Sequence, residues 1–316
     1  MGKKRLTYWG LLPLAALLAG CMADYEERPD ATGGGLDGLV PIYMTASVLE
    51  AEADKGGAGT RAGADVQSSQ LASGETFTVA FSGNTTVAST TYKTSNGSGS
   101  TACSGTQPYF TLAGTSTTVY AYYPEKPGRS FSVQADQSGD ANYKKSDLMY
   151  ATVASLAKTG TATTASLTFS HKMAKIIVNV TGVTGEAITK ITDVRIIGGS
   201  RTINVTNPTT CTLGSTLDDA NSTSSYVTMY TGGTGKAAFT CAALIPPQTI
   251  NGDFLLVKTD VGDITCSLTN KTFDSGKSYT YSMAISYDVT GELTATLTSP
   301  GDVLTSPGDV NSSTWQ

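Results

Sequence analysis

Few side chains in this 316-residue chain have both the type and the spacing that catalysis needs. Its single histidine, His171, lies beside no nucleophile motif, and no serine stands in a G-x-S-x-G sequence. The adjacent pair Asp218 and Asp219 lacks the spaced oxygen ligands of a calcium loop. The glycine-rich runs lack the Lys-Ser/Thr that completes a phosphate loop. We therefore predict no enzyme activity, no catalytic residue, no metal site and no cofactor.

One cysteine lies where covalent modification is expected. Basic residues 3–5 precede an apolar run, Leu11–Ala19, that ends in Leu18-Ala19-Gly20-Cys21. This pattern is typical of a secretory signal and is too short to span a bilayer. Its ending resembles the lipobox of bacterial lipoproteins, in which the cysteine becomes the acylated N-terminus. We expect a signal peptide at 1–20, lipidation at Cys21 and a tether at 21–37; an ordinary signal with a chance cysteine is the alternative.

A second place for chemistry is the peptide bond after Arg61. Thr60-Arg61-Ala62 lies in a stretch of small, charged and glycine residues, 51–64, and proteolysis concentrates in such loops. The preceding segment, 38–50, alternates in polarity with period two and predicts a half-buried strand. The inward residues of this strand are Val40, Ile42, Met44, Ala46 and Val48. We therefore interpret segment 38–50 as a strand that a cleavable link, 51–64, joins to the rest of the chain. The alternative is a strand followed by an ordinary surface loop.

The composition and the spacing of turn-forming residues predict an all-β protein. The chain is 39% hydrophobic and 15% charged, contains 34 glycines, and shows strand signals every 8 to 15 residues from Glu75 onward. No convincing helix of three turns is found. Two β-sandwich domains in tandem, 38–170 and 171–290, are the economical architecture. The net charge of −5 and the lack of a basic patch argue against nucleic-acid binding.

The tail, 291–316, carries an exact tandem repeat. Leu297–Val303 is repeated at once as Leu304–Val310, which we interpret as a duplication in a tolerant tail. Leu293, Ala295 and Leu297 begin an alternating run that Pro300 and Pro307 interrupt. Proline cannot donate to a β-ladder, so a strand here would be short. Besides Cys21, the chain has four cysteines whose pairing the sequence leaves open: Cys103, Cys211, Cys241 and Cys266.

Five motifs in order resemble the fimbrillin family, the pilin-like lipoproteins of type V pili in Gram-negative bacteria. They are an aromatic strand ending in proline, a short strand late in the first domain, an interdomain strand, a Pro-Pro-Gln turn and a near-terminal hairpin. These motifs are Thr117–Pro124, Asp147–Ala151, Phe169–Ile176, Leu244–Gln248 and Phe273–Tyr281. Each motif is weak alone, but together with the lipobox they cover most of the chain.

The resemblance implies a transthyretin-like fold in each domain and assembly by donor-strand exchange. An Arg-specific protease would cut after Arg61, removing the first strand and freeing the body from its outer-membrane lipid at Cys21. A C-terminal strand from another pilin subunit would fill the groove, and the corresponding donor here is the run at Leu293, Ala295 and Leu297. Because Pro300 interrupts this run, the chain is expected to be a stalk subunit or a tip or accessory subunit of a cell-surface fimbria that serves adhesion.

A second class of function remains open at this point. A monomeric, surface-anchored glycan-binding lipoprotein would need exposed aromatic platforms for sugars. The aromatic candidates are Tyr109, Tyr122, Tyr143 and Tyr226, which fit strand cores equally well.

Overall fold

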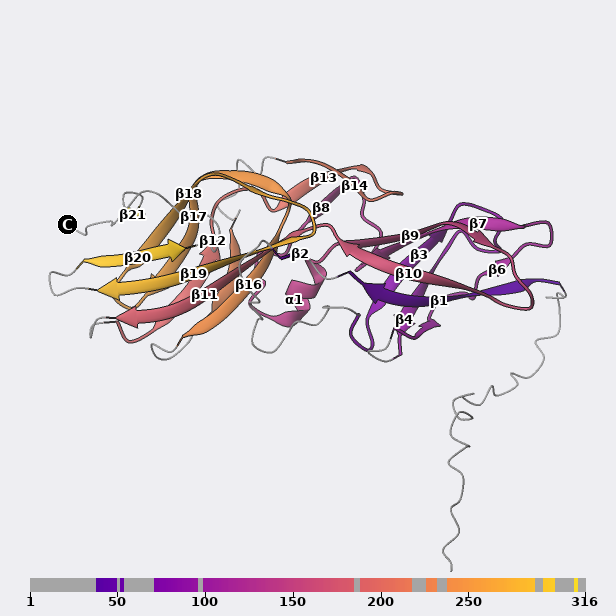
Figure 1. The fold of residues 1–316 in the computed structure, drawn as a ribbon, viewed down its shortest axis with the longest axis horizontal. Coiled ribbons are helices and arrows are strands. Elements are labelled where there is room, and N and C mark those ends of the chain that lie inside the picture. Colours follow the sequence, from indigo (N-terminus) through magenta and orange to yellow (C-terminus); the bar gives the residue numbers. More distant parts are fainter. Residues whose placement is uncertain are drawn as a thin grey trace, which may run out of the picture. The chain divides into compact units, whose positions relative to one another are not determined.

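A computed structural model describes residues 38–49, 52–53, 71–95, 99–184, 188–217, 226–231, 238–287, 292–298 and 310–311 (Figure 1). Cys21, Arg61, the pair Asp218 and Asp219, and most of the tandem repeat lie outside these residues. The described part is mostly β-strand with one short helix, α1 (Asp140–Lys145), which confirms the all-β prediction. Assignment to two tandem transthyretin-like sandwiches stays a prediction. No helix in the described segments has the length and apolarity to cross a membrane.

The first half of the described chain forms an eight-stranded sheet in the order β5-β4-β3-β7-β9-β10-β1-β6. Its strands are β1 (Val40–Val48), β3 (Thr76–Phe81), β4 (Ser89–Thr94), β5 (Thr101–Cys103), β6 (Tyr109–Phe110), β7 (Ser116–Tyr123), β9 (Met149–Ala157) and β10 (Thr163–His171). All neighbours pair antiparallel except β1 and β10, which run parallel. A bridge between Thr45 and Ser100 joins β1 to the residue before β5, so the sheet curls until its two ends meet.

Alternation along these strands builds a first core inside the curled sheet. Phe77 and Val79 of β3 are wholly buried, and Thr78 between them is partly exposed. Phe77 stacks on Tyr92 at 6.0 Å between ring centroids and meets the edge of Phe169 at 5.4 Å. These rings bring β3, β4 and β10 together, and the inward face of β1 completes the same core.

The second half, together with the short strand β2 that follows β1 in the sequence, forms two sheets around a second core. One has the order β16-β11-β19-β2 with β20 also on β19, and the other the order β15-β12-β17-β18-β21. The strands are β2 (Glu52–Ala53), β11 (Ala174–Thr184), β12 (Ile191–Ile196), β15 (Val227–Thr231), β16 (Phe239–Ile245), β17 (Gln248–Thr259), β18 (Asp263–Phe273), β19 (Lys277–Tyr287), β20 (Leu293–Thr298) and β21 (Val310–Asn311). Phe254 lies 5.5 Å from Phe273 and 5.6 Å from Tyr281, which links both sheets through aromatic contacts.

A third, small sheet joins the two cores. Its order is β14-β13-β8, where β8 (Ser130–Ser132) comes from the first half and β13 (Thr202–Asn207) and β14 (Thr212–Thr216) come from the second. Nearby, the wholly buried Gln137 side chain accepts from the Leu244 N–H at 2.8 Å and donates to the Leu244 carbonyl at 2.9 Å. The amide thus occupies the place of a neighbouring strand at the edge of β16.

Two of the sequence motifs also meet at this junction. His171, the last residue of β10, lies with its Nδ1 2.8 Å from the Oδ1 of Asp147, and both side chains are almost buried. Lys144 of α1 reaches Glu75 before β3 at 2.6 Å, and the same carboxylate accepts from the Tyr123 hydroxyl at 2.9 Å. The junction is therefore held by polar contacts between segments that are distant in the sequence.

Candidate functional site: the groove that holds β1

The inward face of β1 is a row of buried apolar side chains. The five predicted residues, Val40, Ile42, Met44, Ala46 and Val48, are only 0–7% exposed. The side chains of Tyr43 and Thr45 between them are exposed. Burying the larger members of the row stabilises the fold by roughly 1.5–3 kcal/mol each. The structure thus places all five residues together on the core side of one strand.

One edge of β1 is hydrogen-bonded to β10. The register is parallel and runs from Ile42 opposite Thr163 to Val48 opposite Phe169. Just past the strand, the Leu49 N–H donates to the Phe169 carbonyl at 2.8 Å. Parallel neighbours cannot be joined by a tight hairpin, and here more than a hundred residues separate the partners. The pairing of β1 therefore depends on non-local contacts.

The other edge of β1 meets side chains as well as backbone. The carbonyl of Ile42 accepts from the Tyr92 hydroxyl at 2.7 Å and from Nε2 of Gln107 at 2.8 Å. The carbonyl of Met44 accepts from the Thr101 hydroxyl at 2.7 Å. Burial raises the pKa of Tyr92, so its phenol stays protonated as a donor. Three side chains thus donate hydrogen bonds to main-chain carbonyls of β1.

Backbone groups complete this far edge. The Ile42 N–H donates to the Pro108 carbonyl at 3.0 Å, and the Ala46 N–H donates to the Gly99 carbonyl at 2.9 Å. Gly99 has φ +83°, and a Cβ built there would lie 2.6 Å from the Ala46 carbonyl oxygen. Glycine is therefore required both by the conformation and by the close approach of the two chains. The sequence reading missed all these contacts, because Gly99 lies in a Gly/Ser-rich segment that reads as a plain loop.

The predicted donor run lies in the second core of this chain. Leu293, Ala295 and Leu297 belong to β20, which pairs antiparallel with β19, and Ala295 and Leu297 are buried. Val310, in the second copy of the tandem repeat, pairs with Cys266 through β21. These residues therefore have partners within their own subunit. Arg61 and Cys21, the predicted cleavage and lipidation residues, lie outside the described residues.

The aromatic candidates for sugar binding do not form a platform. Tyr122 and Tyr143 are buried, and the Tyr122 hydroxyl donates to the Thr209 carbonyl at 2.7 Å. Tyr226 lies beneath the guanidinium of Arg195, which is 4.7 Å from its ring centre. Tyr109 pairs with Pro41 at the start of β1. The rings of Tyr122, Tyr143 and Tyr226 thus take part in the fold.

The four cysteines Cys103, Cys211, Cys241 and Cys266 are free thiols. Burial raises the pKa of Cys211 and of Cys266 to about 11 in each case. These two thiols are therefore protonated and poorly nucleophilic at neutral pH. The pairing that the sequence left open is resolved in favour of no disulfide among the four.

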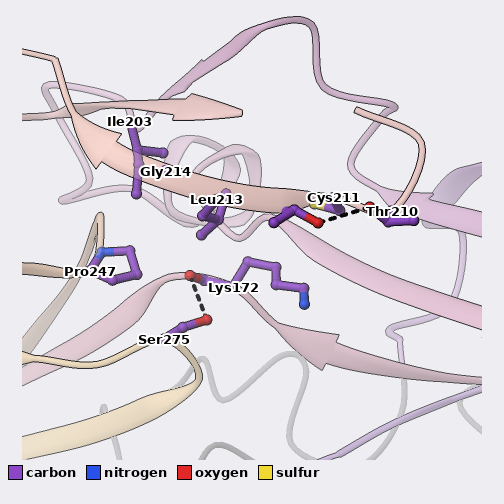
Figure 2. A pocket seen from close by; sticks show the side chains of 9 residues that line it. Lys172, Ile203, Thr210, Cys211, Leu213, Gly214, Pro247 and Ser275 are labelled. Carbon is purple, nitrogen blue, oxygen red and sulfur yellow. Dashed lines mark hydrogen bonds between the residues drawn. The ribbon is translucent and has the colours of Figure 1, made fainter. Parts of the chain in front are cut away.

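A cleft of about 380 Å³ opens between the β13–β14 hairpin and the segments that lead into β11 and β19 (Figure 2). Leu213 and Cys211 face it from the hairpin, and Lys172, Pro247 and Ser275 face it from the opposite side. The Ser275 hydroxyl donates to the Lys172 carbonyl at 3.1 Å. The lining of the cleft combines the Lys172 cation and the protonated Cys211 thiol with hydroxyl groups and apolar side chains. The sequence could not reveal it, since its walls come from separate segments.

The sequence matches the model of the Fimbrillin-like family over residues 60–299. No curated protein is similar enough in sequence to count as a relative. Among solved structures, a candidate cell adhesion protein from Bacteroides ovatus aligns with a TM-score of 0.59 at 16% identity, covering 82% of this chain and 96% of the other. A second candidate cell adhesion protein, from Bacteroides uniformis, aligns with a TM-score of 0.53 at 16% identity, covering 84% and 99%. The family match spans most of the chain, and on that basis the protein belongs to the fimbrillin-like family.

Proposed function

We propose that this protein is a subunit of a type V fimbria that is made as a lipid-anchored precursor and serves adhesion. An Arg-specific surface protease removes β1 after Arg61, and the vacated groove receives a strand from another fimbrial subunit. Membership of the fimbrillin-like family supports a fimbrial or adhesive role at the cell surface. The protein acts by assembly and has no enzymatic activity. Both domains take the transthyretin-like sandwich form.

The observation that carries the proposal is the way β1 is held. Its five inward side chains are buried, while its hydrogen-bond partners all lie far away in the sequence. The only chain connection of β1 to the body runs through residues 49–71, which include Arg61. One cut there leaves β1 bound by non-covalent contacts alone. The family match begins at residue 60, so the part shared with the family starts next to the proposed cut.

Loss of β1 creates a vacancy that only another strand can fill well. The edge of β10 would carry unpaired backbone groups, and the first core would face water along the former row of β1. A donor strand replaces the hydrogen bonds and the apolar contacts together. Because acceptor and donor surfaces differ, such contacts propagate from subunit to subunit.

The subunit's place in the fibre follows from its tail. Donation of Leu293, Ala295 and Leu297 requires β20 to leave β19 and the second core. The apolar alternation then stops at Pro300. The chain is therefore better suited to receive a strand than to give one, which favours a tip or accessory position over the stalk. The anchor at Cys21 holds the precursor on the outer membrane until cleavage.

Limited digestion tests this function. Arg-specific protease should convert the lipidated precursor into a soluble product that begins at Ala62. The Arg61→Ala variant should resist release, whereas Arg129→Ala, which changes an exposed arginine elsewhere, should be processed normally. Incubation with other subunits of the same fimbria should then give SDS-resistant complexes and fibres in electron micrographs. A clean product that forms no complex with any subunit would argue against assembly.

Glycan binding by a monomer is the weaker proposal. Its aromatic candidates Tyr122 and Tyr143 are buried, and Tyr226 is covered by Arg195. No observation favours it over fimbrial assembly.

A further inference from the structure

The far edge of the groove offers contacts that suit one register of a bound strand. Tyr92 and Gln107 both donate to the carbonyl of the second inward residue, Ile42. Thr101 donates to the carbonyl of the third inward residue, Met44. A strand shifted by two residues keeps its backbone pattern but places different side chains in the pockets. The register therefore matters only if the pockets differ in size.

The pockets do differ. The first three inward positions and the fifth hold Val, Ile, Met and Val, but the fourth holds Ala46, which is 2% exposed. Enlarging a fully enclosed alanine overpacks the core. At the same place the chain of Gly99 comes so close that a Cβ on it would lie 2.6 Å from the Ala46 carbonyl oxygen. The fourth position is thus narrow on both its side-chain and its main-chain sides.

Two positions also exclude proline. The N–H groups of Ile42 and Ala46, the second and fourth inward residues, donate to the carbonyls of Pro108 and Gly99. Proline has no N–H to make these bonds. By contrast, β1 itself carries a proline at Pro41, near the strand start. The groove therefore specifies a short pattern: apolar, apolar, large apolar, small, apolar at alternate residues, without proline at the second or fourth.

The tail of this chain does not contain that pattern. In its best frame, Leu293, Ala295 and Leu297 take the first three positions and Ser299 the fourth, but the fifth is Gly301. Pro300 would then stand where Ser47 lies opposite Thr168 of β10. Frames that start at Ala295, Leu297, Val303 or Leu304 place serine, glycine, proline or polar residues in the third or fourth pocket.

We infer that the groove selects its strand by register, through Gly99 and the narrow fourth pocket, and that its partner is a strand of a different protein rather than the C-terminal tail of a second copy of this chain. This inference rests on the proposed function, because it assumes that β1 can be exchanged. Its partner is defined by chemistry: an extended segment with three apolar residues, then a small one, then an apolar one, at alternate positions.

Peptide competition on the nicked full chain tests the inference. A specific protease site replacing residues 56–61 allows a cut that does not depend on Arg61, and β1 then stays bound without a covalent link. A labelled peptide of residues 38–49 should exchange into the groove. As competitors, the same peptide with Thr45→Leu should be within threefold of the parent, and with Ala46→Leu at least tenfold weaker. A peptide of residues 293–304 should also be at least tenfold weaker.

A glycine pair provides the matched control in the receptor. Gly99→Ala should weaken exchange of the parent peptide at least tenfold. Gly74→Ala should not, because Gly74 has nearly the same φ, +86°, but its nearest neighbour is 3.8 Å from a built Cβ. If Gly99→Ala does not fold, the competition on the unaltered groove decides alone.

The outcomes separate the two proposals. If the parent peptide never exchanges, the detachable strand of the proposed function is refuted and the inference falls with it. If the parent exchanges but Ala46→Leu competes as well as Thr45→Leu, or the tail peptide as well as the parent, only the register selection is refuted.

Discussion

Truncation of Ile42 to alanine is the most direct test of how β1 is held. Ile42 is the second inward residue of β1 and is 0% exposed. Removing most of its side chain loses the transfer free energy of the methyl groups and leaves a cavity that the rigid sheet cannot close. Such substitutions cost about 2–5 kcal/mol. We therefore expect Ile42→Ala to be among the most destabilising single changes in β1.

The expected shift in melting temperature follows from that free energy. For a chain of this size, 1 kcal/mol corresponds to about 2 °C, so Ile42→Ala should melt roughly 4–10 °C lower than the parent protein. Thr45→Ala is the matched control, because Thr45 lies on the same strand and its side chain is exposed. The Thr45 hydroxyl donates a long hydrogen bond, 3.3 Å, to the Ser166 hydroxyl. A surface change of this kind stays within about 0.5 kcal/mol.

The assay is differential scanning calorimetry of the intact chain, with nicked chain in parallel. In the nicked chain, Ile42→Ala should also speed the departure of the β1 peptide, measured by gel filtration. Equal melting temperatures for Ile42→Ala and Thr45→Ala would refute the reasoning, because the two faces of β1 would then be energetically equivalent. In that case the strand would be held by its backbone bonds and not by its apolar face.

Three further outcomes are expected. Burial raises the pKa of Tyr92 above its ordinary value near 10, so the folded state holds the phenol proton more tightly than the unfolded state does. The stabilisation from this difference is complete below pH 10 and is lost as the pH rises further. Tyr92→Phe should therefore flatten the decline of the unfolding free energy above pH 10, measured by urea titration. Gln137→Ala leaves both backbone groups of Leu244 without a partner and should cost about 2–4 kcal/mol in the same assay, whereas an unchanged midpoint would contradict the strand-like role of that amide. At pH 8 the partly exposed Cys103 should react with a thiol reagent well before the buried Cys266, whose pKa is raised to about 11, and equal rates in the folded protein would exclude this burial.

Local alternation was enough to predict β1 but not its neighbours. The period-two pattern of Val40 to Val48 identifies the strand and its inward face, and both agree with the structure. Its partners are Thr163–Phe169 on one edge and residues 99–110 on the other, and no local signal links such distant segments. Likewise, Asp147 and His171 belong to two motifs that each looked unremarkable alone, and their 2.8 Å contact appears only when β9 and β10 come together.

The same non-locality is why β1, and not another strand, is the one proposed for exchange. Most strands here have a neighbour that follows closely in the chain, such as β17 and β18 or β19 and β20, so a single cut leaves them tied to the sheet by a short turn. β1 has no such neighbour, because its main partner β10 runs parallel to it and lies beyond six intervening strands of the same sheet. Parallel pairing requires a long connection, and here residues 49–162 connect β1 to β10. A cut between β1 and β3 therefore leaves β1 held by non-covalent contacts alone, among them the close approach of Gly99 and the enclosed side chain of Ala46.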